Sequence, residues 1–68
     1  MLLKFRNIRK EKGLSLSDIA NELHVSTSYI SLIERGQRNL DYKFAIKLAN
    51  IFYMTPDELF LEDIKGEE

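Results

Sequence analysis

Hydroxyl-bearing side chains gather in one short stretch of this 68-residue sequence. Four of the six residues from 26 to 31 are serine or threonine, and a tyrosine adds a fifth hydroxyl: Ser26, Thr27, Ser28, Tyr29 and Ser31. Serine and threonine form helices poorly away from an N-cap. A helix that carries this many hydroxyl residues on its outer face is therefore expected to need them for function. Such groups can donate to phosphates or touch base edges, and the Thr methyl can meet a thymine methyl. The alternative is a solvated helix face with one capping residue.

A polar loop follows this stretch directly. It contains Gln37, Arg38 and Asn39, and Lys43 lies a few residues further along the chain. These side chains suit hydrogen bonding to phosphates, and the loop would lie beside the DNA backbone if the preceding helix entered the major groove. Three other lysines are interpreted as solvated charges: Lys10, Lys12 and Lys47.

The sequence offers little to metal, cofactor or enzymatic chemistry. It has no cysteine and a single histidine, His24, which excludes a disulfide framework and a cysteine-based zinc site. It contains no nucleophile paired with a base and no glycine-rich phosphate loop. We therefore expect no enzyme, no metal, no cofactor and no small-molecule substrate.

The charges are distributed unevenly along the chain. The net charge is −1, but residues 1–56 hold nine Lys or Arg against five Asp or Glu, a balance of +4. Residues 57–68 hold six acids and only Lys65, a balance of −5. These acids fit a solvated tail, and the alternative is a segment that keeps a basic face from binding indiscriminately. The asymmetry leaves DNA open as a partner.

Apolar residues recur at helical spacing in blocks separated by capping signals. The first block covers residues 2–12 and stops at Gly13, the position expected of a helix C-cap. Ser15 starts a second helix, with Asp18 three residues on as an Asp variant of the capping box. A third helix is predicted over residues 26–35, closed by a glycine.

Two further helices are predicted in the C-terminal half. Asp41 caps the fourth, which carries apolar residues at core spacing. Thr55 is the predicted N-cap of the fifth, with Pro56 at its first position, and this helix is predicted to end near Leu61. The fold class is thus all-α, with one five-helix domain over residues 1–61 and an acidic, flexible tail over residues 62–68.

The joint between the second and third helices is the most informative feature of the fold. Residues 23–26 leave about three residues for reversal, which makes the two short helices meet at a steep angle, as in a helix-turn-helix. His24 would need a positive φ in such a turn. Placing the third helix at about 100° per residue puts Ile30 and Ile33 inward, with Tyr29 beside them. Leu32 lies at the edge, either as core rim or as an apolar contact to thymine.

The sequence of these two helices resembles the Cro/XRE (lambda-repressor-like) helix-turn-helix family. Residues 14–26, LSLSDIANELHVS, are similar to the second helix and turn of these proteins, and residues 28–36, SYISLIERG, to their third helix. Arg9 and the run PDELF at residues 56–60 extend the similarity over nearly the whole chain.

The resemblance implies binding to an operator as a two-fold dimer, with the third helix in the major groove. It assigns base contacts to five positions: Thr27, Ser28 and Leu32, with Tyr29 and Ser31 beside them. It assigns phosphate contacts to Ser26, Arg35, Gln37, Arg38 and Asn39. Arg9 and Glu34 match a structural ion pair that joins the first helix to the third.

Three residues depart from the family pattern. Leu16 stands where many members carry a Gln that contacts DNA, so that contact is expected to be missing. His24 replaces the usual glycine of the turn, and Leu40 replaces a frequent proline before the fourth helix.

The leading hypothesis is a cytoplasmic transcriptional regulator from a bacterium or phage, acting as a repressor. It would bind a (pseudo)palindromic operator as a homodimer, with half-sites about 34 Å apart. The predicted dimer patch is formed by Tyr53, Met54, Phe60 and Leu61, and the alternative for these residues is core filling. The alternative function is an antitoxin-like or anti-regulator protein-interaction module with weak or no DNA binding. No apolar run is long enough for a membrane span.

Overall fold

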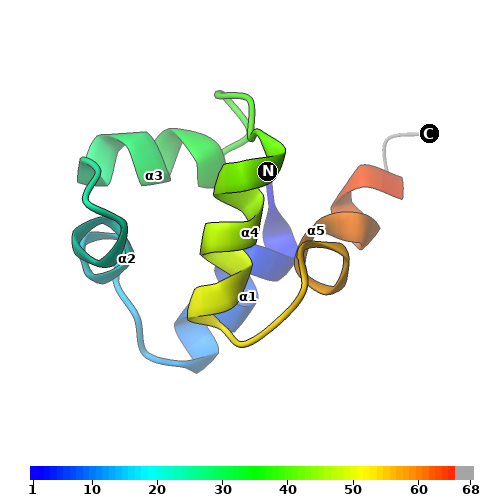
Figure 1. The fold of residues 1–68 in the computed structure, drawn as a ribbon, viewed down its shortest axis with the longest axis horizontal. Coiled ribbons are helices and arrows are strands. Elements are labelled where there is room, and N and C mark those ends of the chain that lie inside the picture. Colours follow the sequence, from blue (N-terminus) through cyan, green and yellow to red (C-terminus); the bar gives the residue numbers. More distant parts are fainter. Residues whose placement is uncertain (66–68) are drawn as a thin grey trace.

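A computed structural model describes residues 1–65, with side chains to Phe60, and consists of helices joined by short turns and loops, without a strand among these residues. Its five helices are α1 (Leu3–Glu11), α2 (Leu16–Leu23), α3 (Thr27–Glu34), α4 (Tyr42–Ile51) and α5 (Pro56–Lys65). The predicted all-α, five-helix fold is confirmed. Figure 1 shows α3 and the loop after it at one end of the molecule and the α1–α2 turn at the other.

Side-chain caps begin four of the helices. Ser15 and Asp18 form a complete capping box, with Asp18 N–H donating to Ser15 Oγ at 3.0 Å and Ser15 N–H donating to Asp18 Oδ2 at 2.8 Å. Thr55 and Glu58 form a second box at α5, with N–H···O distances of 3.2 and 2.8 Å. Ser26 caps α3 and Asp41 caps α4, each with one side-chain bond. Local sequence signals therefore place all four starts.

The first four helices end in the same way. A residue with positive φ follows the last turn, and the next N–H donates back to a carbonyl five residues earlier, as in a Schellman motif. The residues in the left-handed conformation are Gly13, His24, Gly36 and Tyr53. The positive φ predicted for His24 is confirmed at 58°. At Gly36 a Cβ would come 3.2 Å from the backbone nitrogen of Met1, so this position restricts side chains by space as well as by φ.

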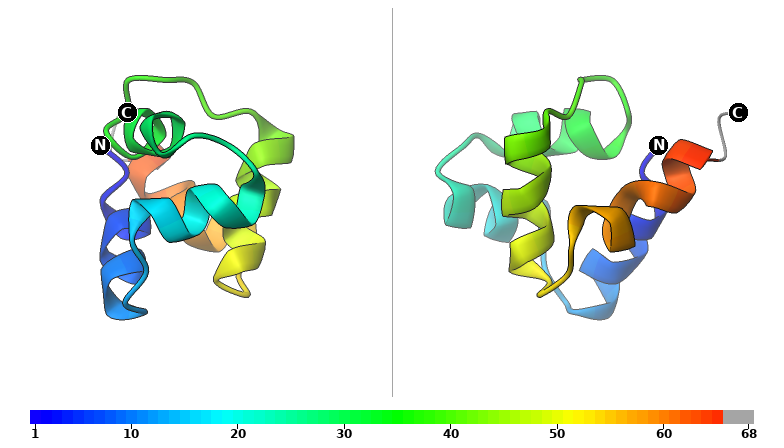
Figure 2. Two further views of the ribbon diagram at one scale, coloured as in Figure 1. Left: turned by 90° about the vertical axis from the view of Figure 1, so that its left-hand side faces the viewer. Right: turned by 45° about the vertical axis from the view of Figure 1, so that its right-hand side comes forward.

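One apolar core joins all five helices. Its fully buried members are Phe5, Ile19, Ile30, Ile33, Leu48 and Leu59. The ring of Phe5 packs on Phe52 and Phe60, with centroid distances of 5.7 and 6.3 Å, which ties α1 to the end of α4 and to α5. In the left view of Figure 2, α2 and α3 lie toward the viewer between α1 and α4, with α5 behind them.

The C-terminal end differs from the prediction in two respects. Helix α5 does not end near Leu61 but continues to Lys65, because no helix breaker occurs before Gly66. Phe60 is 4% exposed, so it fills the core and is not available to the predicted dimer patch. Core filling was the alternative given for this residue. The predicted flexible tail includes residues 66–68, which lie outside the described residues, as does the side chain of Leu61.

Within residues 1–65, none of the helices has both the length and the apolar character needed to cross a membrane.

Candidate nucleic-acid interface

The turn between α2 and α3 sets the two helices at a steep angle. His24 adopts φ 58° and ψ 42°, and Val25 N–H donates to the carbonyl of Ala20 at 3.0 Å. In Figure 1, α2 is viewed nearly along its axis while α3 lies across the picture. Ala20 is 1% exposed, and its small side chain lets α2 and α3 approach closely. This is the arrangement of a helix-turn-helix.

The N-terminal half of α3 presents hydroxyl groups to solvent. Thr27 and Ser28 are exposed, and Ser31 is half-buried one turn further along. The Thr27 hydroxyl lies 3.3 Å from the hydroxyl of Ser17 at the start of α2. The two helix starts therefore share one polar surface, on which each hydroxyl can rotate between donor and acceptor roles.

Ser17 was not among the residues singled out from the sequence. It lies ten positions before Thr27, and no local pattern pairs residues at that spacing across a turn. Leu16, where the family pattern often has Gln, is half-buried and packs against the core. The polar group that α2 offers at this edge is thus the Ser17 hydroxyl.

Ser26 is partly committed to the fold. Its Oγ accepts a hydrogen bond from Tyr29 N–H at 3.1 Å, which leaves its hydroxyl hydrogen to donate elsewhere. The predicted phosphate contact needs only this hydroxyl hydrogen, because a phosphate oxygen accepts, so the cap and the contact are compatible.

Leu32 lies half-buried on the side of α3. Among the residues with described side chains, it is absent from the half-buried apolar residues that pack against the core.

The loop after α3 is ordered by a stack of three side chains. The Cζ atom of Arg38 lies 4.8 Å from the ring centroid of Tyr29, and this ring packs on Phe44 of α4 with a centroid distance of 5.3 Å and an interplanar angle of 76°. Gln37 and Asn39 flank Arg38 and are exposed. Gln37 N–H donates to the carbonyl of Leu32 at 2.9 Å, which fixes where the loop leaves α3.

Positive charge is concentrated near this loop. Arg35 and Lys43 are exposed at the end of α3 and the start of α4, on either side of the exposed Arg38. The Arg35 Nε donates to the carbonyl of Ser31 at 3.4 Å, which leaves its terminal N–H groups on the surface. Except for Ser26, which caps the N-terminus of α3, the sequence-predicted phosphate residues therefore surround the C-terminal end of this helix, while the exposed hydroxyls lie toward its N-terminal end.

Glu34 does not offset this charge because it is buried and paired with Arg9. Arg9 Nε and Nη2 donate to the two carboxylate oxygens of Glu34 at 2.8 and 3.3 Å, and Arg9 Nη1 donates to the carbonyl of Leu14 at 2.9 Å. Their side chains are 11% and 8% exposed. A two-pronged pair of this kind fixes α3 to α1 with a defined orientation.

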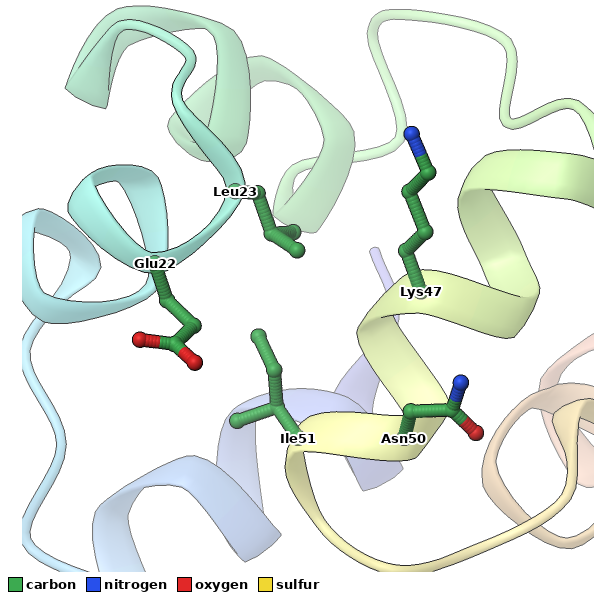
Figure 3. Close-up of a pocket in the computed structure, with 5 residues that line it drawn as sticks. All are labelled: Glu22, Leu23, Lys47, Asn50 and Ile51. Carbon is green, nitrogen blue, oxygen red and sulfur yellow. The ribbon is translucent and has the colours of Figure 1, made fainter.

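A pocket of about 260 Å³ lies away from these residues, between the C-terminal halves of α2 and α4. Figure 3 shows Leu23 and Ile51 facing each other across it, with Glu22, Lys47 and Asn50 at its edge. One acid, one base and one amide select no single class of ligand. Among the described residues there is no cluster of three or more metal-ligating side chains.

Known proteins are similar in sequence to most of the chain. The HTH-type transcriptional regulator DdrOP3 of Deinococcus deserti is 36% identical over 56 residues, which cover 82% of this chain and 43% of the relative. The HTH-type transcriptional regulator SinR of Bacillus subtilis is 35% identical over 65 residues, which cover 94% of this chain and 59% of SinR. An uncharacterized HTH-type transcriptional regulator of Archaeoglobus fulgidus is 27% identical over 63 residues, which cover 93% of this chain and 90% of the relative.

The chain spans about half the length of DdrOP3 and SinR. No solved structure matches the chain significantly. The helix-turn-helix family model matches residues 5–59, which include α2, the turn at His24, α3 and the Arg9–Glu34 pair. The chain therefore belongs to the Cro/XRE-type helix-turn-helix family.

Proposed function

We propose that this chain is the DNA-binding part of a transcriptional regulator and that α3 enters the major groove. The observation that carries the proposal is the division of α3 into a buried face with Ile30 and Ile33 and an exposed face with Thr27 and Ser28. An exposed helix of this width fits the major groove. The regulators among the relatives support the same role.

The proposed contacts divide into two groups. Thr27, Ser28 and Leu32 read base edges, and Ser31 lies beside them. Phosphates are held by Ser26, Arg35, Gln37, Arg38, Asn39 and Lys43. Phosphate contacts set the position of the protein on the duplex, whereas base contacts determine sequence preference.

The assembly that we propose is a homodimer on a (pseudo)palindromic operator, with half-sites about 34 Å apart. Of the predicted dimer patch, Tyr53 remains the accessible aromatic, at 95% exposed, and Met54 is half-buried. Repression by occupancy of the operator is the simplest regulatory outcome for such a dimer. A chromosomal operator would place the protein in the cytoplasm.

The first experiment selects bound sequences from a random DNA pool and measures the affinity for the best site between 50 and 200 mM salt. Three exposed cations per protomer, Arg35, Arg38 and Lys43, predict a log–log salt slope of about −2.7 per protomer and about −5 for a dimer. Enrichment of a two-fold symmetric site with this slope supports the proposal. Binding without enrichment contradicts a sequence-specific regulator, and little or no salt-dependent DNA binding contradicts the proposal and favours the protein-interaction module.

Single substitutions then test the face of the helix. Ser28→Ala and Thr27→Ala should weaken binding to the selected site and relax the preference at the contacted bases. Lys43→Ala should weaken binding to all sequences alike. The matched controls are Asn7→Ala and Lys10→Ala, which alter exposed residues of α1. If the controls weaken binding as much as the α3 variants, the proposed face is wrong.

A further inference from the structure

Among the described residues at this surface, the Tyr29 side chain connects three elements: α3, the loop after it and α4. Its ring receives the guanidinium of Arg38 at 4.8 Å and packs on the ring of Phe44 at 5.3 Å. The Tyr29 and Phe44 side chains are half-buried, whereas Arg38 is exposed. Two neighbours therefore already occupy the aromatic surface of Tyr29 in the free protein.

Stacking of this kind leaves the hydrogen-bonding capacity of Arg38 intact. A guanidinium is attracted to the face of an aromatic ring, while its five N–H donors point outward in its own plane. Among the described residues, no carboxylate or carbonyl accepts a hydrogen bond from Arg38. Its donors thus lie at the surface without a partner in the described part of the chain, in a geometry that suits two oxygens of one phosphate.

We propose that Tyr29 is a positioning residue that holds Arg38 ready for a DNA phosphate, and that it does not read a base. This inference rests on the proposed DNA-binding function and changes the role that the sequence predicted for Tyr29. Arginine loses much rotamer freedom when it is ordered. Because the Tyr29 ring already restricts the Arg38 side chain in the free protein, less conformational entropy is lost when DNA binds. The affinity for DNA is therefore higher than it would be with a freely moving Arg38.

A double-mutant cycle tests the role. DNA affinity is measured for the wild type, Tyr29→Leu, Arg38→Gln and the double variant, on both the selected site and a random-sequence duplex. Tyr29→Leu should weaken binding roughly two- to fivefold when Arg38 is present, the value of one exposed cation–π contact. It should have no further effect in the Arg38→Gln background. Arg38→Gln alone should reduce the magnitude of the salt slope by about 0.9 per protomer.

The two DNA probes separate positioning from base reading. A phosphate contact is independent of sequence, so the loss caused by Tyr29→Leu should be equal on the two duplexes. A base-reading Tyr29 would instead cost affinity on the selected site alone, and its effect would persist without Arg38. Either of those results, or equal losses with and without Arg38, overturns the positioning role.

Two measurements guard against a trivial folding defect. Tyr29→Phe keeps the ring and should bind DNA as the wild type does, whereas a hydroxyl contact to DNA would make it resemble Tyr29→Leu. In the free protein, NMR should show ring-current shifts of the Arg38 side-chain protons in the wild type and in Tyr29→Phe, and not in Tyr29→Leu. Absence of these shifts in the wild type overturns the inference.

The outcomes separate the two proposals. A wild type that shows no salt-dependent DNA binding overturns the proposed function, and the positioning role with it. A wild type that binds DNA, with variants whose effects are additive, overturns the positioning role alone.

Discussion

Two joints in this fold share one backbone design, residues 23–26 between α2 and α3 and residues 52–55 between α4 and α5. In each, a left-handed residue ends the helix, with φ 58° at His24 and 57° at Tyr53. In each, the next N–H donates 3.0 Å back to an alanine carbonyl, and a Ser or Thr then caps the following helix. The two turns are thus nearly interchangeable as local structures.

The helices that follow the two turns are not interchangeable. The first turn of α3 contains no acid and exposes Thr27 and Ser28, whereas the first turn of α5 carries Asp57 and Glu58. Acids at this position stabilise a helix N-terminus but repel a phosphate backbone. The comparison teaches that the turn makes a joint, and that the side chains after the cap decide whether the joint can face DNA.

The largest expected effect concerns how each helix is anchored after its joint. Helix α3 is tied to α1 by the buried Arg9–Glu34 pair, so Glu34→Ala leaves a buried charge unpaired and should cost about 3–5 kcal/mol. A domain of this size has little more stability than that, so urea titration followed by circular dichroism should find the variant largely unfolded at 25 °C. Arg9→Met combined with Glu34→Leu removes both charges and should recover most of the loss. A cost below about 1 kcal/mol for Glu34→Ala would show that the pair is not the anchor.

The sequence predicted the helices well because their boundaries depend on local signals. Caps such as Ser15, Ser26 and Thr55 satisfy N–H groups only a few residues away, and the positive φ of His24 follows from the length of its turn. The predicted end of α5 near Leu61 was wrong because polar residues can continue a helix until a breaker such as Gly66.

The candidate interface was predicted residue by residue but not as an arrangement. The outward positions of Thr27 and Ser28 follow from helical periodicity. The contact of Thr27 with Ser17 and the stack of Arg38 on Tyr29 depend on how separate elements pack, so neither was anticipated. Phe60 illustrates the same limit, because an apolar residue near a helix end fits a core and an interface equally well until its neighbours are known.

The next effect in size compares the two caps. Ser26→Ala and Thr55→Ala should each lower the free energy of unfolding by about 1 kcal/mol, because each loses one side-chain bond to a helix N–H. The corresponding Gly variants should lower the free energy of unfolding by only a few tenths of a kcal/mol. Only Ser26→Ala should also weaken DNA binding, as measured by fluorescence anisotropy with labelled duplex. An equal loss of DNA affinity in Thr55→Ala would place α5 in the interface and end the distinction between the joints.

A smaller effect of opposite sign is expected at the left-handed residues. His24→Gly and Tyr53→Gly should each raise stability by up to about 1 kcal/mol, since relief of left-handed strain outweighs the added freedom of the unfolded chain. Tyr53 is 95% exposed, so its ring contributes little packing that glycine would remove. Thermal unfolding of the two variants and of a His24/Tyr53 double glycine variant measures both gains and their additivity. If either variant loses stability, its side chain makes a contact that offsets the strain.

The smallest expected effect is a pH dependence that distinguishes the second joint from the first. Hydrogen bonding of the Glu58 carboxylate, first to the backbone N–H of Thr55 and then to its hydroxyl, lowers the pKa of Glu58 below its ordinary value of 4.5. A lowered folded-state pKa means that this cap stabilises the fold fully above the ordinary value and loses its contribution as the pH falls through the folded-state pKa. The Ser26 cap of α3 has Tyr29 at the reciprocal position and contains no carboxylate, so acid should leave it intact.

The backbone N–H of Ser15 lowers the pKa of Asp18 below 3.8 in the same way, which makes the α2 cap an internal comparison. Glu58→Gln keeps a side-chain acceptor without a titrating group, so the fall in thermal midpoint between about pH 5 and pH 2 should be shallower in this variant than in the wild type. An unchanged pH profile in Glu58→Gln, with a flattened one in Asp18→Asn, would assign the acid sensitivity to the α2 cap instead of the second joint.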